Sequence, residues 1–356
     1  MIRALRPGTG RTRAIGLAGL AACILALGIA AADPRALAGW LAACLFWSSL
    51  PIGALALAMM TRLIPGRWSA ELRELTDGAL MLLPLAAVSI LPVLLAPGAL
   101  YGWAHAAQEP GFRAAYLTPW FFSLRTLAFF AVAMLLAILL LNRRRDLSSV
   151  SAAGLIVLVL IDSMIATDWL MSLDAGFHSS GFGLYVLSIQ FTIALAFLIL
   201  ARLREPGAQA DVLGSLLLTA LLLWAYLAFM QYVIIWSGNL PEGVLWYQRR
   251  AAGFWSLAEY AIGALHLAPA FLLLFGAMRR SPSWLAALAL STLIGKALEA
   301  AWLVLPARTD HGWLTAATSI LAFAGLGCLT LAVVAEAPRL LQALDEKRWR
   351  PKEAAR

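Results

Sequence analysis

Ionisable side chains inside apolar runs are the residues of this sequence best suited to chemistry. Lys296 and Glu299 lie three residues apart in one such run, a spacing that lets two side chains pair on a helix. Glu259 and His266 lie seven residues apart in the preceding run and share one helical face. A carboxyl group in hydrocarbon holds its proton more readily than one in water, and an imidazole can relay that proton. These four residues are proton-path candidates; for Lys296 and Glu299 the alternative is a structural ion pair.

Two acids in the apolar run 150–173 extend this set of proton-path candidates. Asp162 lies in the middle of the run, and Asp168 lies near its end, where it could instead be solvated at the membrane surface. An ionisable group in hydrocarbon is costly and needs a partner or a water path. We therefore expect Arg125, which lies in another apolar run, to be the internal counter-ion of a buried acid. The acids considered for it are Asp162, Glu259 and Glu299.

Uncharged polar side chains in the apolar runs form a second group. Gln190 and Gln231 are of the type that bridges helices by hydrogen bonds, with contact to water or a quinol as the alternative. Trp224 and Trp302 lie deep in their runs, and we expect them to pack in the core rather than line a site. The polar or quinol-contact candidates are Arg125, Gln190, Tyr226 and Gln231.

Ten apolar runs must position these residues. The chain has 356 residues, of which 62% are hydrophobic and 13% charged, and its mean hydropathy is +0.83. A membrane-spanning helix needs about 20 apolar residues. The sequence therefore predicts an all-α polytopic membrane protein, with a membrane domain over 15–335, an N-terminal segment 1–14 and a basic tail 336–356. The predicted spans are 15–32, 37–60, 78–95, 118–141, 150–173, 181–201, 212–236, 253–277, 284–305 and 313–334.

The basic residues are distributed unevenly between the two sides of the predicted membrane domain. Of the 27 Lys and Arg residues, 20 lie in the terminal segments and in the loops on their side, and 5 lie in loops on the other side. Cytoplasmic segments carry such an excess, so both termini are predicted to be cytoplasmic. The net charge of +8 therefore reflects topology, and no binding of nucleic acid is predicted.

The first span has a second interpretation. The basic segment 1–13, the apolar run after it and the small residues 30–32 could form a cleaved signal peptide. The run is long for such a peptide, so we favour a retained helix. Cleavage would leave nine spans with the same topology.

No metal cofactor is predicted in this chain. The three cysteines lie singly in the first, second and tenth runs, without the spacing of an iron–sulfur or c-type haem motif. Of the four histidines, His266 alone lies well inside a run, whereas a bis-histidine haem needs two facing histidines in the membrane. The sequence has no glycine-rich phosphate-binding loop with its lysine, so direct use of ATP is not expected.

The segment 224–250 leaves the membrane through aromatic residues into a polar loop. Gly238 and Asn239 are expected to end the helix, and Pro241 to keep it from resuming. The topology places this loop on the side that is poor in basic residues, where its two arginines break the trend. We interpret the loop as a docking surface for a partner subunit, with contact to lipid phosphate as the alternative. The docking candidates are Asn239, Glu242, Trp246, Tyr247, Arg249 and Arg250.

The same segment, WAYLAFMQYVIIWSGNLPEGVLWYQRR, resembles the polysulfide-reductase-type (NrfD-like) integral membrane family. Within that family the similarity is to the ActF subunit of alternative complex III, a bacterial quinol:cytochrome c oxidoreductase. It extends from about residue 116 to 305. Supporting motifs are Asp168-Trp-Leu-Met-Ser-Leu-Asp174, Ser179-Ser-Gly-Phe-Gly183, and Tyr116-Leu-Thr-Pro119 followed by Phe121, Phe122 and Arg125.

The resemblance implies two four-helix bundles with flanking helices, in the inner membrane of a bacterium. It also implies partners: a sister subunit of the same fold, multihaem and monohaem cytochromes c, and an iron–sulfur protein. Haem c and iron–sulfur clusters would lie in those partners. A quinol would bind at the sister subunit, with binding to this chain also possible, and this chain would contribute a proton path.

The chain departs from the family's pattern at two places. Ala175-Gly176 stands where a Pro-His pair is common, with a histidine later at His178, and Met230 replaces a small polar residue. Two other functions stay open beside a proton-carrying subunit. One is a structural scaffold for the same partners. The other is a secondary transporter, against which the interior prolines count because they show no pairing between two halves.

Overall fold

The structure is all-α over the residues that it describes. It is a computed structural model of the whole chain and describes residues 9–105, 111–142, 147–174, 176–307 and 312–349. These ranges contain helices and no β-strand. Ten helical stretches within them are long and apolar enough to cross a membrane, which confirms the predicted class of polytopic membrane protein.

The long helices follow the predicted apolar runs. They are α1 (Thr9–Ala32), α2 (Leu37–Leu63), α7 (Pro119–Leu141), α8 (Leu147–Trp169), α9 (Phe182–Arg202), α10 (Ala210–Ser237), α12 (Phe254–Leu273), α14 (Pro282–Val304) and α15 (Trp313–Trp349). The third span is a broken series made of α3 (Arg67–Ala79), α4 (Leu83–Ser89) and α5 (Leu91–Leu95). Pro84 and Pro92 lie in the first turns of α4 and α5, where the missing N–H of proline is tolerated.

The first four-helix bundle comprises α2, the α3–α5 series, α7 and α8. In this bundle α2 contacts α3, α4 and α8, and α7 packs against α4 and α8. Most of the surface of α2 is covered, since 94% of its most apolar stretch is buried inside the chain. This helix therefore lies at the centre of the molecule.

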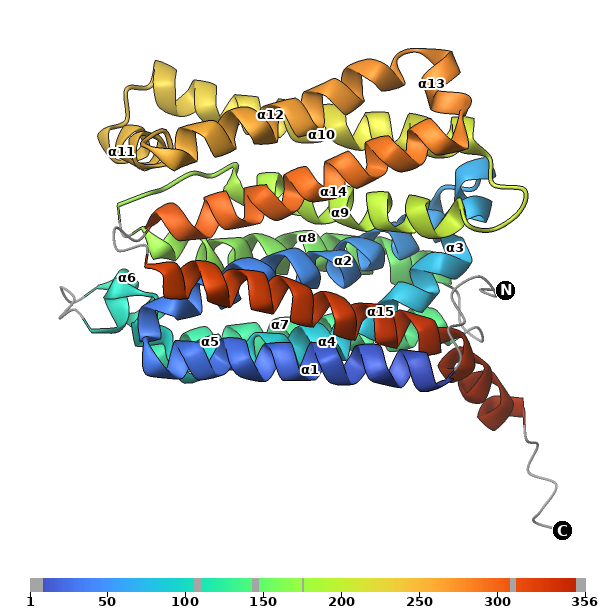
Figure 1. Cartoon of the computed structure of the whole chain (residues 1–356), viewed down its shortest axis with the longest axis horizontal. Coiled ribbons are helices and arrows are strands. Elements are labelled where there is room, and N and C mark those ends of the chain that lie inside the picture. Colours follow the sequence, from blue (N-terminus) through green and yellow to red (C-terminus); the bar gives the residue numbers. More distant parts are fainter. Residues whose placement is uncertain (1–8, 106–110, 143–146, 175, 308–311, 350–356) are drawn as a thin grey trace, which may run out of the picture.

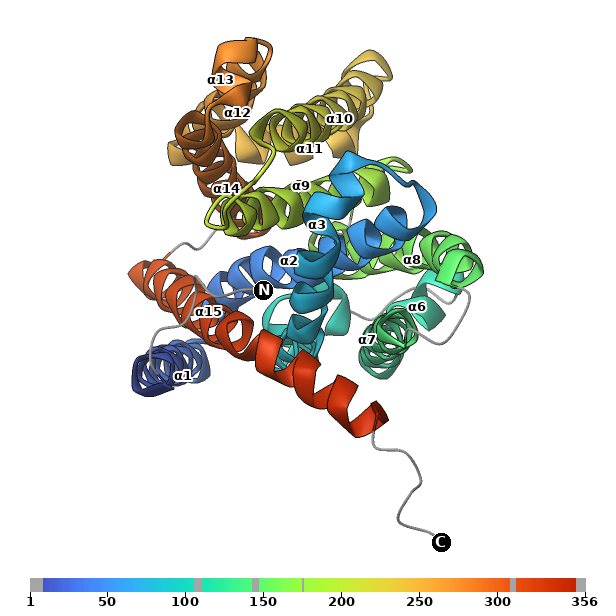
Figure 2. The same cartoon turned by 90° about the vertical axis from the view of Figure 1, so that its right-hand side faces the viewer.

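The second four-helix bundle comprises α9, α10, α12 and α14 (Figure 2). The two bundles meet where α2 packs against α9 and α14, and where α8 packs against α9. The flanking helices α1 and α15 pack against each other, and α15 also packs against α2. Two bundles with flanking helices are the arrangement that the sequence resemblance implies.

The helices run along the long axis of the molecule, and their connections gather at two ends (Figure 1). One end holds α3, the short helix α13 (Gly276–Arg280), the start of α1 and the end of α15; we call it the α13 end. The other end holds the short helices α6 (Phe112–Tyr116) and α11 (Pro241–Arg250), and we call it the α11 end. Alternate connections therefore lie at the same end. This agrees with the sequence, in which the loops rich in basic residues alternate with the loops poor in them.

The two bundles approach most closely where α2 crosses α9. A Cβ atom added at Gly53 of α2 would lie 2.2 Å from the backbone oxygen of Gln190, far inside contact distance. Backbone atoms of a helix cannot move aside as the end of a flexible side chain can. Small residues at such positions let helices of membrane proteins pack backbone to backbone.

Replacing Gly53 by alanine is expected to lower the free energy of unfolding by about 1–3 kcal/mol, because the added methyl group overpacks this contact. The matched control is Gly28→Ala in α1, where no described atom lies within 4 Å of an added Cβ. Alanine also favours a helix over glycine. Unfolding of the two purified variants in detergent compares them. Equal stability of the two variants would contradict the close contact.

Candidate functional site

A buried ion pair in α14 is the centre of the candidate site. The Nζ atom of Lys296 lies 2.8 Å from Oε2 of Glu299, and the two side chains are 0% and 1% exposed. The predicted pairing over three residues is therefore confirmed. Charges this far from water persist because each offsets the other and because hydrogen bonds satisfy the remaining polar atoms.

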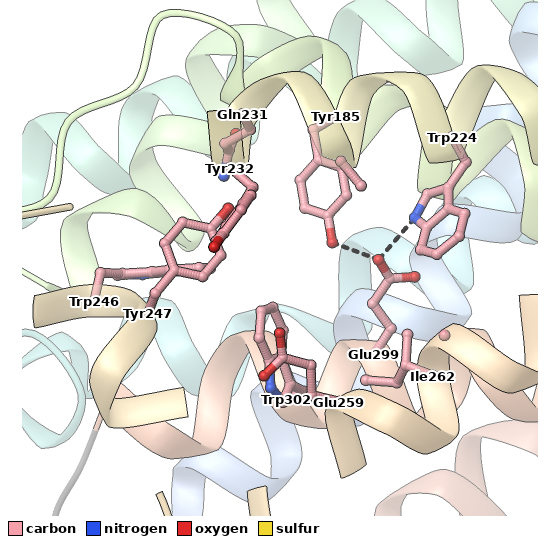
Figure 3. A pocket seen from close by; sticks show the side chains of 12 residues that line it. Tyr185, Trp224, Gln231, Tyr232, Trp246, Tyr247, Glu259, Ile262, Glu299 and Trp302 are labelled. Atoms are coloured by element: carbon pink, nitrogen blue, oxygen red, sulfur yellow. Dashed lines mark hydrogen bonds between the residues drawn. The ribbon is translucent and has the colours of Figure 1, made fainter. Parts of the chain in front are cut away.

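Hydrogen bonds from two neighbouring helices hold the carboxylate of Glu299. Trp224 of α10 donates its Nε1–H to Oε1 of Glu299 over 2.8 Å. The hydroxyl of Tyr185 of α9 donates to the same oxygen (Figure 3). Hydrogen bonds to an ionised acceptor are stronger than those between neutral groups. The carboxylate thus joins α9, α10 and α14.

His266 of α12 adds a third titratable group to this pair. Its Nδ1 lies 2.6 Å from the carbonyl oxygen of Ile262, which can only accept, so Nδ1 carries the ring proton. Nε2 lies 3.9 Å from Oε2 of Glu299 and has no hydrogen-bond partner in the described part of the chain. The imidazole stacks on Trp224 with 4.2 Å between ring centroids. We call Lys296, Glu299 and His266 the Glu299 cluster.

The partner of His266 differs from the one expected. The sequence spacing predicts His266 and Glu259 on one face of the helix, whereas in the structure the His266 ring lies beside Glu299 of α14. Glu259 lies about two turns away from His266 along α12. It lies at the edge of a cavity that also reaches Glu299. The two acids are therefore connected through this cavity.

The cavity has a volume of about 200 Å³ and opens between α9, α10, α11, α12 and α14. Gln231 is buried in its wall, and Glu259 is exposed to the outside of the chain. Trp224 and Trp302 are buried as expected, but they line this cavity, so the expectation that they do not line a site was wrong. The lining is mostly apolar but includes the polar groups of Gln231, Tyr247 and Glu259. A cavity of this volume has room for several waters, each taking about 30 Å³.

The helix α11 covers this cavity, where a polar loop was expected. Pro241 lies in the first turn of α11 and so begins a helix instead of preventing one. The turn between α10 and α11 is made at Asn239, whose φ of 45° is in the left-handed region that asparagine tolerates. Trp246 and Tyr247 of α11 line the cavity. Burial raises the pKa of Tyr247, so this phenol stays protonated at neutral pH.

Arg250 fastens α11 to the rest of the chain. Its side chain is 1% exposed and lies 3.3 Å from Oδ2 of Asp174, and its Nη2 donates to the carbonyl oxygen of Leu303 over 2.9 Å. The guanidinium also lies 3.7 Å from the centroid of the Trp246 ring. Burial lowers the pKa of Arg250 to about 10 against the opposing effect of Asp174, so it stays charged at neutral pH.

The predicted docking surface is therefore smaller than the sequence indicated. Trp246 and Arg250 are buried inside this chain and cannot present their side chains to a partner, which corrects that prediction. Asn239, Glu242 and Arg249 are exposed at the α11 end and stay docking candidates. Arg249 also pairs with Asp174.

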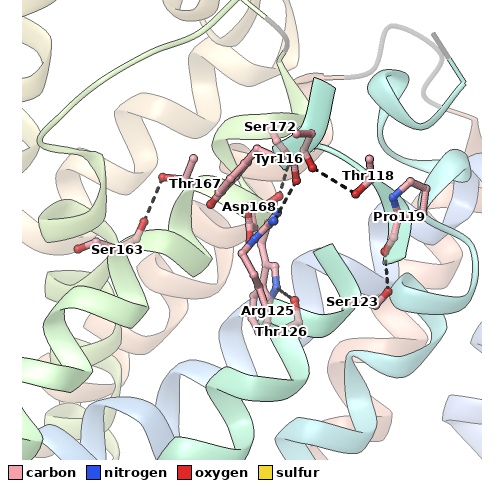
Figure 4. Close-up of polar contacts among 12 residues, drawn as sticks. Tyr116, Thr118, Pro119, Ser123, Arg125, Thr126, Ser163, Thr167, Asp168 and Ser172 are labelled. Atoms are coloured by element: carbon pink, nitrogen blue, oxygen red, sulfur yellow. Dashed lines mark hydrogen bonds and ion pairs between the residues drawn. The ribbon is translucent and has the colours of Figure 1, made fainter. Parts of the chain in front are cut away.

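The first bundle holds a second buried ion pair, and it differs from the one predicted. Arg125 of α7 binds Asp168 of α8 in a bidentate manner, with distances of 2.6 Å and 2.9 Å (Figure 4). None of the three acids considered for Arg125 is its partner, and Asp168 is fully buried rather than solvated. Tyr116 stacks on the guanidinium at 3.7 Å. Burial and the Asp168 carboxylate raise the pKa of Tyr116 to about 12.

The remaining polar candidates lie apart from the Glu299 cluster. Gln190 of α9 donates to Asp162 of α8 over 2.8 Å, which confirms its expected role as a helix bridge. In the described part, Oδ2 of Asp162 and Oε1 of Gln190 have no hydrogen-bond partner. Tyr226 is 59% exposed on the outer face of α10, so the structure does not bring it to the cavity.

Two residues at the centre of this geometry were not predicted as site residues. Tyr185 reads in the sequence as one aromatic residue of an apolar run, and Asp174 as a loop acid. Each gains its role from a partner at least 75 residues away in the sequence. Within the described residues, no three His, Cys, Asp or Glu side chains are grouped as metal ligands.

Comparisons with known proteins add no family to this geometry: no protein-family model matches the chain, and no curated protein matches it.

Removing one member of the Lys296–Glu299 pair should destabilise the protein more than removing both. Glu299→Gln leaves the ammonium of Lys296 buried without a counter-ion, which is expected to cost about 3–5 kcal/mol of unfolding free energy. Lys296→Met leaves the carboxylate uncompensated in the same way. The double variant should lose less than either single variant, because it leaves no lone buried charge. The free energy of unfolding of all three variants is measured in mixed micelles. Strictly additive losses would contradict a direct pair.

Replacing Arg250 by lysine should loosen α11, because lysine lacks the planar fork that contacts Asp174 and Leu303 together. We expect faster hydrogen exchange of the backbone amides in Pro241–Arg250, measured by mass spectrometry. Arg249→Lys is the matched control, since Arg249 is half exposed. An exchange rate in Arg250→Lys no faster than in the control would show that Arg250 does not hold the helix.

Proposed function

We propose that this chain is an integral membrane subunit of a respiratory quinol:cytochrome c oxidoreductase of the alternative complex III type. In this proposal it has no redox centre and carries protons. Electrons pass through its partners, which are a sister subunit, multihaem and monohaem cytochromes c and an iron–sulfur protein. The resemblance of the segments 116–125, 168–183 and 224–250 supports this complex. It also supports the inner membrane of a bacterium as its location.

The observation that carries the proton path is the Glu299 cluster. The side chains of His266 and Lys296 each lie within 4 Å of the Glu299 carboxylate, inside a membrane-spanning bundle. An ion pair that serves packing alone needs neither a third titratable group nor an adjoining cavity. The unpartnered Nε2 of His266 can accept a proton, and Glu299 can exchange one with it.

The cavity connects this cluster with the α11 end. Glu259 at the cavity edge is exposed, and a short file of waters in the cavity would join its carboxylate to Glu299. The uneven distribution of basic residues favours a cytoplasmic α13 end, so the cavity faces the periplasm in this proposal. Protons released at the periplasmic face would then leave past Glu259.

The α13 side of the cluster favours a barrier. Between Lys296 and that end, α14 buries Leu285, Leu288, Ala289 and Thr292, three of them apolar. Protons do not cross such a layer without water or a change in packing. We propose that quinol oxidation in the partner subunits drives that change in packing. Without it, the apolar layer keeps the path closed.

The assembly is tested first. Purification of the tagged chain from its native membrane in mild detergent should bring down subunits with haem c absorption bands and iron–sulfur electron paramagnetic resonance signals. Recovery of the chain alone, without these signals, would contradict membership of the complex.

The proton path is tested in the intact complex reconstituted into vesicles. Glu299→Gln and Glu259→Gln should each lower the number of protons released per quinol oxidised, because the amide of glutamine neither takes up nor releases a proton near neutral pH. Glu336→Gln is the control: this partly exposed acid of α15 lies at the α13 end, paired with Arg339. An unchanged proton yield in both test variants would reject the path and favour a structural scaffold.

A further inference from the structure

A larger groove lies away from the Glu299 cluster, between the flanking helices and the second bundle. It has a volume of about 660 Å³ and is bounded by α1, α15, α9 and α14. Apolar side chains such as Phe197, Leu293 and Leu331 make up most of its wall. Trp47 of the central helix α2 closes the inner side, and its Nε1–H is already bonded to the carbonyl oxygen of Phe323 at 2.9 Å. The inner wall therefore favours an apolar occupant.

Two arginines line the same groove at the α13 end. Arg11 lies in the first turn of α1, and Arg204 follows the end of α9. Both are exposed, and neither makes an ion pair with a residue in the described ranges. The neighbouring Arg202, by contrast, pairs with Glu71 at 2.8 Å. The groove thus combines two positive charges that have no ion-pair partner among the described residues with an apolar interior.

We propose that this groove is a binding site for one anionic phospholipid. Arg11 and Arg204 hold the phosphate of the headgroup, and an acyl chain lies in the groove toward Trp47. Each arginine near a membrane surface contributes a factor of about five to the binding of an anionic lipid. The excess of basic residues at the α13 end places the groove in the leaflet where such lipids are recognised.

The dimensions of the groove distinguish this occupant from a helix of a partner protein. A helix about 10 Å across would fill 660 Å³ with less than two turns. An acyl chain is a single file of methylene groups and fits the same volume along most of its length. The two arginines also favour an anionic lipid over a zwitterionic one. In a zwitterionic lipid, the cation of the headgroup competes with the arginines for the lipid's own phosphate.

The proposal is tested by native mass spectrometry of the full-length chain in detergent. The chain is titrated with phosphatidylglycerol and with phosphatidylcholine of the same acyl chains. We expect tighter binding of phosphatidylglycerol, and about thirtyfold weaker binding of it by the double variant Arg11→Gln, Arg204→Gln. Binding of phosphatidylcholine should change little. The matched control is Arg13→Gln, Arg280→Gln, which removes two exposed charges at the same end but from outside the groove.

A second variant tests the acyl-chain part. Ala201→Phe fills the groove and leaves both arginines in place, so it should also weaken binding of phosphatidylglycerol. Unfolding midpoints confirm that each variant is folded. Three results would overturn the proposal: equal binding of the two lipids by the wild type, an equal loss in the control, or full binding by Ala201→Phe. A contaminating lipid at the surface would give the second of these results.

Discussion

The carboxylate of Glu299 is the interaction on which the second bundle depends. It accepts hydrogen bonds from Tyr185 of α9 and Trp224 of α10, pairs with Lys296 on its own helix, and lies 3.9 Å from His266 of α12. A charge in a low-dielectric interior is tolerated only with such compensation. All four helices of the bundle must therefore take their places around this one group. The cavity lies beside this group, and the rings of Tyr185 and Trp224 that bind the carboxylate also line it.

The segment 168–174 connects this site with the first bundle. Its first acid, Asp168, binds Arg125 of α7, and its last, Asp174, binds Arg250 of α11. Two buried or nearly buried arginines are thus held by acids six residues apart, one arginine in α7 of the first bundle and one in α11, which covers the second. This short connection fixes α11 over the cavity and α6 and α7 against α8. The α11 end is consequently organised by ion pairs, whereas the middle of the molecule is organised by close helix packing such as that at Gly53.

The two ends of the molecule have different physical characters. At the α11 end, the arginine–carboxylate pairs are internal and a cavity leads inward to titratable groups. At the α13 end, Arg11 and Arg204 are exposed beside an apolar groove, and an apolar layer of α14 separates that end from Lys296. Under the two proposals made above, the α11 end would exchange protons with water and the α13 end would contact lipid headgroups.

The sequence by itself determined the ten spans, the Lys296–Glu299 pair and the bridging character of Gln190. These depend on hydropathy, on spacing within one turn of helix, and on the cost of a lone polar group in hydrocarbon. Tertiary structure alone decided which acid Arg125 binds, why His266 meets Glu299, and that Arg250 and Trp246 are buried. Those contacts join residues far apart in the sequence: Arg125 and Asp168 are 43 positions apart, and Arg250 and Asp174 are 76 positions apart. No local pattern encodes them, because several acids lie at similar depths and the packing of the helices selects among them.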